Sequence, residues 1–375
     1  QPSNDPLGEQ THYAIRHQIE EEDEADSLPN FSEEPPAPSI HEQEEQEQEQ
    51  PQLQLKQLVA RKGSRPRRES TLSEENINSV LVWKNLTVTT KARGSSDVKV
   101  LLNNVSGAMT GGMWAVMGPS GCGKSTLLNT LACRLDVNTT VVGEMRLNGR
   151  PYHNAELKKM SGYVMQDDLL NGSLTVRETL YYTAALRLPR TFTSQERAER
   201  VEEVIREMGL THCQDVIVGD PQQKGISGGE RRRLCIGMEL LMRPTLLFLD
   251  EPTSGLDSVT AVSLVELLHR ISRSGKCSMM MSIHQPQARL FALFDRLLLL
   301  KSGRILYQGS IPGALQLFED CGFPVPHYSN PADHILDVIT PPMDSSLTDY
   351  FEHEGIARVA EADTLMPPIA EDNTT

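Results

Sequence analysis

Short apolar runs separated by polar turns mark the chain from about residue 79 onward. These runs are rich in β-branched and aromatic side chains, which is typical of strands. The strands predicted for the first half of this region are residues 80–83, 86–89, 98–102, 114–117 and 143–149. One helical run follows the fourth of them. The first half is therefore predicted to be mostly β, built around a single strand–helix unit.

The pattern becomes helical between residues 173 and 242. A helix starts near Leu174, and the pair Thr193 and Glu196 predicts a capped helix that Gly209 ends. Apolar strands then alternate with helical stretches, which indicates a parallel α/β sheet. The elements predicted here are strands 246–249, 278–283 and 296–300 and a helix over about 258–275. In such a sheet, ligands bind at the carboxyl ends of the strands.

Residues 1–75 follow a different pattern, because they are acidic and rich in Gln and Pro. Such a stretch cannot bury enough apolar surface to offset its chain entropy, so we predict a disordered tail with a basic patch at 61–68. An ordered domain is predicted over 76–325, with a helical insertion over about 167–243. Residues 326–375 are predicted to be a linker.

Charge and cysteine content exclude several classes of protein. The first sixty residues hold fifteen acidic and two basic side chains, so the rest of a chain of net charge −15 is nearly neutral. A nearly neutral remainder argues against a nucleic-acid platform, which would show a basic face. The six cysteines include no C-x-x-C pair, which indicates reduced thiols and neither a disulfide framework nor a zinc site. No apolar run reaches the ~20 residues that span a bilayer.

A phosphate-binding loop follows the strand predicted at 114–117. Its sequence fits G-x-x-x-x-G-K-[ST] at every required position, and an apolar helical run comes next. Backbone N–H groups and the helix N-terminus would hold the phosphates, Lys124 would reach the outer ones, and the Ser125 hydroxyl would bind Mg²⁺. The residues expected to bind the nucleotide here are Gly118, Pro119, Ser120, Gly121, Cys122, Gly123, Lys124, Ser125 and Thr126.

Polar residues follow three other predicted strands. Asp250 and Glu251 end the strand 246–249, so Asp250 is expected to hold Mg²⁺ and Glu251 to act as the general base. His284 follows the strand 278–283 and is expected to contact the γ-phosphate. Gln166 follows a strand-like run and can serve both Mg²⁺ and the attacking water.

A second anion-binding helix start lies at Ser227, Gly228, Gly229 and Glu230. One nucleotide does not need two such cradles. Two chains packed head to tail would place this one over the γ-phosphate of the partner's nucleotide.

These motifs together resemble the nucleotide-binding domain of ABC transporters. The particular residues within the motifs are similar to those of subfamily G, the White/pleiotropic-drug-resistance type. The resemblance covers about residues 79–340, and its motifs are 118–126, 226–230, 251–258, 282–286 and 330–333. A phosphate loop alone would leave GTPases and kinases open, but no Asn-Lys-x-Asp guanine motif is present.

The resemblance implies a P-loop NTPase with a RecA-like α/β core, an antiparallel β subdomain and an inserted helical subdomain. It also implies that Glu251, His284 and Gln166 are catalytic, that Ser125, Gln166 and Asp250 serve Mg²⁺, that Ser227, Gly228 and Gly229 act in trans, and that Asp257 lies at the dimer seam. Two positions depart from the family pattern: Ile226 replaces Leu, and Thr90 falls where an adenine-stacking aromatic is often found.

The implied function is an ATP-hydrolysing subunit that powers export of a lipophilic substrate by ATP-driven dimerisation. Its partners would be a second nucleotide-binding domain and a transmembrane domain expected but absent from this chain, with no nucleic acid. The location implied is the cytoplasmic face of a membrane. The alternatives are a soluble ABC-type ATPase that acts on nucleic acid or ribosomes, and a catalytically silent cassette.

Overall fold

The computed structural model describes residues 80–91, 98–152, 154–220 and 222–341. The acidic tail, the basic patch and the last part of the predicted linker lie outside these residues. In the described part, no helix combines the length and the apolar character that crossing a bilayer requires.

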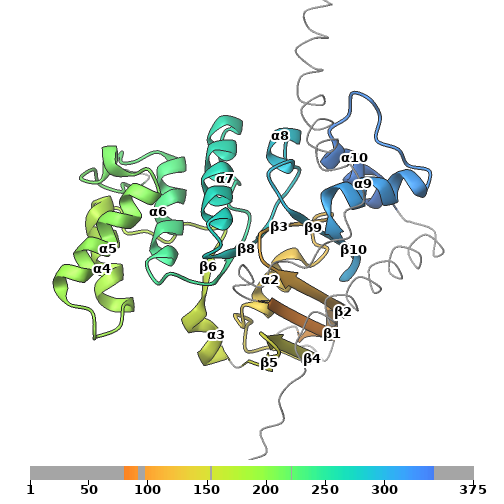
Figure 1. Ribbon diagram of the computed structural model, residues 1–375, viewed down its shortest axis with the longest axis horizontal. Helices are drawn as coiled ribbons and strands as arrows, with labels where there is room; N and C mark the ends of the chain where they lie inside the picture. The colour runs from red at the N-terminus through yellow and green to blue at the C-terminus, as the bar shows by residue number, and fades with distance from the viewer. Residues whose placement is uncertain (1–79, 92–97, 153, 221, 342–375) are drawn as a thin grey trace, which may run out of the picture. The chain divides into compact units, whose positions relative to one another are not determined.

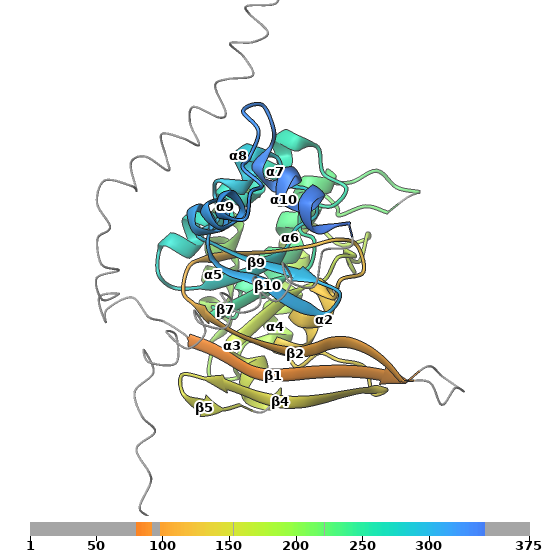
Figure 2. The same cartoon turned by 90° about the vertical axis from the view of Figure 1, so that its right-hand side faces the viewer.

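Two sheets organise the described part of the chain (Figures 1 and 2). The smaller is antiparallel, in the order β2-β1-β4-β5, and its strands are β1 (Val80–Lys91), β2 (Val98–Thr110), β4 (Thr139–Leu147) and β5 (Arg150–Pro151). The larger has the order β10-β9-β3-β8-β7-β6, with strands β3 (Met113–Met117), β6 (Ser161–Val164), β7 (Leu246–Leu249), β8 (Ser278–Ser282), β9 (Arg296–Lys301) and β10 (Arg304–Ser310). Its strand pairs are parallel except for β9 with β10.

Helices lie between the strands and, in α9 and α10, follow the last strand β10 (Figure 1). They are α2 (Lys124–Leu131), α3 (Asn154–Met160), α4 (Val176–Arg187), α5 (Ser194–Glu207), α6 (Gly228–Leu240), α7 (Ser258–Arg273), α8 (Ala288–Phe291), α9 (Ile311–Asp320) and α10 (Pro331–Ile339), with the 3₁₀ turn η2 (Thr211–Cys213). Helices α4, α5 and α6 contact one another between β6 and β7, which is the position predicted for the helical insertion.

Strand β3 divides the core into two clusters, because its side chains alternate between the two faces of the sheet. Met113, Ala115 and Met117 join a cluster with the helical insertion, α7, α9 and α10. Trp114 and Val116 join a second cluster with α2 and the antiparallel sheet. Both faces are therefore covered, as expected for a parallel sheet with continuous apolar strands.

The sequence-based interpretation differs from the structure at both ends of the described chain. The runs 80–83 and 86–89 are one strand, β1, bent where its register with β2 shifts between Trp83 and Leu86. Asn85 lies in this bend with φ 51°, a left-handed conformation that Asn tolerates. At the other end, within the predicted linker 326–375, α10 buries Ile335, Leu336 and Ile339 in the core.

Gly107 on β2 fixes how the antiparallel sheet closes over Trp83. A Cβ at Gly107 would lie 2.4 Å from a ring carbon of Trp83 and 2.4 Å from Gln308 Oε1. We predict that Gly107→Ala lowers the free energy of unfolding by about 1–3 kcal/mol, because the extra carbon overpacks a filled core. Urea denaturation measures this change.

A double-mutant cycle with Trp83→Leu separates this clash from a general effect on the strand. Removal of the ring should make Gly107→Ala less costly, so the two changes should be non-additive. Strict additivity would show that the Trp83 ring does not cause the loss.

Candidate functional site

The phosphate loop runs from the end of β3 to the start of α2. Gly118 has φ 152°, and a Cβ there would lie 2.1 Å from the Leu300 carbonyl oxygen. Gly123 precedes α2 with φ 109°, and a Cβ there would lie 2.9 Å from Leu102 Cδ2. Both positions therefore require glycine.

The N-terminus of α2 carries no acidic residue in its first turn and no side-chain cap. Its positive end is thus left for an anion. Lys124 is 6% exposed, and its Nζ donates to the carbonyl oxygens of Gly118 at 2.9 Å and Pro119 at 3.2 Å. The loop is therefore closed around its own lysine.

Asp250 lies at the end of β7, buried beside two hydroxyl groups. Its Oδ1 accepts hydrogen bonds from Ser125 Oγ at 2.9 Å and Ser282 Oγ at 2.6 Å. Asp250 is 7% exposed, and it forms no salt bridge within the described residues. A buried carboxylate without a cationic partner, next to a serine hydroxyl, is a hard-oxygen donor set that suits Mg²⁺.

Glu251 follows Asp250 and forms hydrogen bonds with residues at the ends of the two strands beside β7, which are β8 and β6. Its N–H donates to Ser282 Oγ at 2.8 Å, and its Oε2 accepts from Gln166 Nε2 at 3.1 Å. Its backbone is left-handed, with φ 44°. A non-glycine residue held in this conformation costs about 1–3 kcal/mol, and such strain gathers at functional sites.

His284 is exposed two residues after the end of β8, and the next residue, Gln285, has φ 45°. Because β8 lies between β3 and β7, His284 follows a strand that separates the phosphate loop from Asp250 and Glu251. Thr90 lies within β1, paired with Lys99 and Thr139, so no aromatic side chain occupies that position.

The second cradle forms the start of α6. Ser227 is the N-cap residue, and its side chain accepts from the Glu230 N–H, while Glu230 accepts from Ser227 in return. Although partial burial raises it, hydrogen bonds from Ser227 and His212 hold the pKa of Glu230 down at about 2. A Cβ on Gly229 would lie 2.4 Å from Thr260 Cγ2, so this turn packs closely against α7.

Asp257 caps α7 through a 3.0 Å hydrogen bond from the Thr260 N–H, and hydrogen bonds from Thr260 lower its pKa. Within the described residues, hydrogen bonds connect Ser125, Asp250, Glu251 and Gln166, directly or through Ser282. No hydrogen bond in this part of the chain joins that group to Ser227 or Asp257.

Two residues of the site were missed by sequence reasoning. Ser282 sits at the end of β8 and reads as an ordinary strand residue, yet it bonds both acidic residues of β7. Arg232 is 3% exposed and donates to the carbonyl oxygens of Met165 at 2.8 Å and Gln166 at 2.6 Å. It also pairs with Asp168 at 2.9 Å, so α6 holds the segment that carries Gln166.

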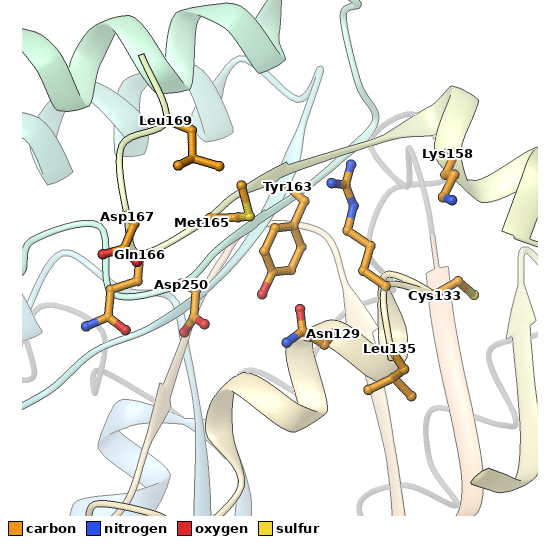
Figure 3. Close-up of a pocket in the computed structure, with 11 residues that line it drawn as sticks. Asn129, Cys133, Leu135, Lys158, Tyr163, Met165, Gln166, Asp167, Leu169 and Asp250 are labelled. Atoms are coloured by element: carbon orange, nitrogen blue, oxygen red, sulfur yellow. The ribbon is translucent and has the colours of Figure 1, made fainter. Parts of the chain in front are cut away.

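A cavity of about 680 Å³ opens beside this segment (Figure 3). Gln166 and Asp250 line one side, and Lys158 lies on the opposite side of the Tyr163 ring. The Arg134 guanidinium lies 5.2 Å from the centre of that ring, within the range of a cation–π contact. The cavity therefore borders the chemical site directly.

A phosphate loop, a buried strand-end acid and a second glycine-rich helix start, built on a mixed sheet with a helical insertion, define an ATP-binding cassette. Comparisons with known proteins lead to the same class of protein. A family model described as "ABC transporter" matches residues 102–254, and one described as "ABC-2 type transporter" matches residues 284–355.

Two curated relatives are similar over most of the described chain. ABC transporter G family member 11 of Arabidopsis thaliana is 45% identical over 274 residues, which are 72% of this chain and 38% of that protein. The broad substrate specificity ATP-binding cassette transporter ABCG2 of Bos taurus is 49% identical over 241 residues, 64% of this chain and 36% of that protein. The chain thus spans less than half the length of the relatives it matches.

A solved structure of the ATP-binding cassette MJ0796, dimeric and bound to ADP and Pi, superposes with a TM-score of 0.52 and 26% identity, covering 62% of this chain and 98% of that one. The chain belongs to the ABC transporter family, and its nucleotide-binding cassette is of the G type. The predicted α/β fold of a P-loop NTPase is confirmed.

One expectation is partly corrected. The transmembrane domain was expected to be absent from the chain, but residues 284–355 match the model of an ABC-2 type transporter. The described residues of that stretch form β9, β10, α8, α9 and α10, which pack on the nucleotide-binding core.

Ser282 supplies a test of the acidic site. We predict that Ser282→Ala destabilises the fold by about 1–3 kcal/mol, because it leaves the Glu251 N–H without its acceptor in a partly buried place. It should also lower ATP turnover by at least tenfold, since Asp250 and Glu251 lose their shared partner. Thermal unfolding and a phosphate-release assay measure the two effects.

Ser278→Ala is the matched control, because Ser278 lies at the other end of β8 and is equally buried. It should leave turnover unchanged. Equal losses of turnover in both variants would contradict a specific role for Ser282.

Proposed function

We propose that this chain binds ATP with Mg²⁺ and hydrolyses it to power transport across a membrane. The observation that carries the proposal is the hydrogen-bonded group at one edge of the larger sheet. It joins Ser125 of α2, Asp250 and Glu251 after β7, and Gln166 after β6. Mg²⁺, when bound, would neutralise phosphate charge as it develops.

Each side chain of this group has a role that its surroundings support. Ser125, Asp250 and Gln166 would hold Mg²⁺, since hydroxyl, carboxylate and amide oxygens are the ligands it prefers. Lys124 would exchange the carbonyls of Gly118 and Pro119 for the β- and γ-phosphate oxygens. Glu251 would orient and deprotonate the attacking water.

His284 would donate a hydrogen bond to the γ-phosphate, consistent with its exposed place after β8. Glu251 starts from a resting position, because its carboxylate is bonded to Gln166. Binding of nucleotide near Gln166 would release that carboxylate toward the water. Hydrolysis would thus depend on how the Gln166 segment is placed.

Completion of the site requires a second cassette. Ser227, Gly228 and Gly229 would cover the γ-phosphate of the partner's nucleotide, and Asp257 would lie at the seam between the chains. The dimeric arrangement of the MJ0796 cassette supports this assembly. In the single chain, the Glu230 carboxylate offsets part of the positive end of α6 and holds the Ser227 side chain in the cap. Affinity of the cradle for a phosphate would therefore increase only when the Ser227 side chain turns toward that phosphate.

The coupling to transport would pass through the helical insertion. Leu169 borders the cavity beside Gln166, and Tyr181, Tyr182 and Leu186 of α4 are exposed. Exposed large apolar side chains of this kind suit a partner surface. We propose that membrane-embedded helices dock here at the cytoplasmic face, and that the transported substrate is lipophilic.

The alternative, a soluble ABC-type ATPase that acts on nucleic acid or ribosomes, is less well supported. Most of the net negative charge lies in the first sixty residues, and residues 61–375 taken together are nearly neutral. The family matches extend to an ABC-2 type transporter model.

Glu251→Gln tests the hydrolytic assignment in the protein expressed from its complete gene. The amide cannot deprotonate water, so turnover should fall by at least a hundredfold while ATP binding persists. A nucleotide-bound dimer should accumulate, which size-exclusion chromatography with ATP detects. A wild-type rate of turnover in this variant would contradict the assignment of Glu251 as the general base.

Glu266→Gln serves as the control, because Glu266 lies on α7 in an exposed ion pair with Arg289. Its turnover should match the wild type. A loss of activity there would point to a nonspecific effect of charge removal.

Arg232→Met tests the link between α6 and the Gln166 segment. The side chain packs but cannot donate to the carbonyls of Met165 and Gln166. We predict a turnover rate reduced about tenfold with little change in KM for ATP, because phosphate binding is intact and only the placement of Gln166 suffers.

Arg232→Lys should recover part of the rate, since one donor remains, and Arg270→Met, on the exposed side of α7, should have no effect. A rise in KM without a fall in kcat would argue that Arg232 supports nucleotide binding and does not position Gln166.

A further inference from the structure

His212, Cys213 and Glu230 bring three metal-binding side chains together away from the phosphate loop. The imidazole nitrogen, the thiol sulfur and a carboxylate oxygen lie within 4.8 Å of one another. His212 and Cys213 are neighbours in η2, and Glu230 belongs to the first turn of α6. Within the part of the chain that the structure describes, no other group of this kind is present.

The Glu230 carboxylate divides its two oxygens between different partners. Oε2 accepts from the Ser227 N–H and Oγ, each at 2.7 Å, which completes the cap of α6. Oε1 lies 2.6 Å from His212 Nε2. One oxygen can therefore bind an ion between His212 and Cys213 while the other keeps the cap.

We propose that His212, Cys213 and Glu230 form a Zn²⁺ site. Zn²⁺ is the divalent ion that accepts nitrogen, sulfur and oxygen ligands together in a tetrahedral set. The Cys213 thiol would lose its proton to solvent as the Zn–S bond forms, and the resulting thiolate and the Glu230 carboxylate would balance the charge of the ion. Water would fill the fourth position.

Burial and exposure fit an exchangeable site. The Cys213 side chain is buried, at 4%, whereas the His212 side chain is 64% exposed. The ion would therefore enter from solvent at His212 and meet the thiol inside. Three protein ligands hold Zn²⁺ less firmly than the four of a structural site, so the site would load and unload with supply.

The ion would tie η2 to the first turn of α6, and so would fix the turn that carries Ser227. The effect of the ion on the nucleotide site rests on the proposed role of Ser227 at the partner's nucleotide. The binding of Zn²⁺ to His212, Cys213 and Glu230 does not depend on that role.

The test is a calorimetric titration of the nucleotide-free chain with Zn²⁺. The wild type should bind one ion that both His212→Ala and Cys213→Ser abolish. With Co²⁺ as the probe, the wild type should show a thiolate-to-cobalt charge-transfer band that is absent in Cys213→Ser. Zn²⁺ at a hundred times its Kd should raise the Tm by roughly 5–10 °C in the wild type, and in neither His212→Ala nor Cys213→Ser.

A double variant of the same residue types, His327→Ala with Cys321→Ser, is the matched control, and it should bind the ion like the wild type. Hydrogen exchange at residues 226–230 should slow when Zn²⁺ is added to the wild type. Binding that survives in both His212→Ala and Cys213→Ser would overturn the proposal, because the ion would then lie elsewhere, for instance at Ser125 and Asp250. Since no nucleotide is present, a failed ATPase assignment leaves this result unaffected.

Discussion

The hydroxyl of Ser282 holds the acidic end of β7 in place. It donates to Asp250 Oδ1 and accepts from the Glu251 N–H, so one small buried group sets the position of a carboxylate and of the following backbone turn. Without it, the Asp250 carboxyl group, which is 7% exposed, would lose one of its two hydroxyl donors, which is costly in a low-dielectric interior. The phosphate loop depends on this anchor, because Ser125 bonds the same oxygen.

The strand order explains why these residues meet. Strand β8 lies between β3 and β7, and β6 lies beside β7, so four strand ends bring the loop, Ser282, the two acids and Gln166 to one edge. The side chains of β3 alternate between two clusters, and each cluster supports different parts of the site. The antiparallel sheet packs on the side of α2, and the helical insertion packs on the other.

The helical insertion connects two separate parts of the proposed nucleotide site. Its α6 begins with Ser227 and carries Arg232 one turn later, where the guanidinium holds the carbonyls of Met165 and Gln166. A shift of α6 must therefore move both the second cradle and the Gln166 segment. A buried guanidinium bonded to backbone resists separation, because unpaired donors in the interior are costly.

Much of the site was predictable from sequence, because residues after apolar strands of a parallel sheet converge by geometry. Asp250 and Gln166 were placed at this edge in this way and belong to one hydrogen-bonded group, while the role of His284 stays a prediction. Ser282 was not assigned a role, since a serine inside a strand looks like any small residue until its hydrogen bonds are known. Arg232 stands between two other arginines, so only its burial distinguishes it from a solvated charge.

Other features could not be predicted from the sequence, because they arise from contacts between residues far apart in the chain. His212 and Glu230 are 18 positions apart, and no local spacing connects them. The absence of a C-x-x-C pair was interpreted as evidence against any zinc site. That argument does not apply to a mixed nitrogen, sulfur and oxygen group formed by the fold, such as the one proposed above. Likewise, residues 326–375 were predicted to be a linker, although the apolar residues of α10 lie at helical spacing and are buried.

The left-handed backbone at Glu251 has a consequence for how such cassettes diverge. Glycine, asparagine and aspartate adopt this conformation at less cost than glutamate. A duplicated copy released from the need to hydrolyse would thus gain stability by replacing Glu251 with one of them. The general-base role proposed for Glu251 therefore carries a cost in fold stability at this backbone position.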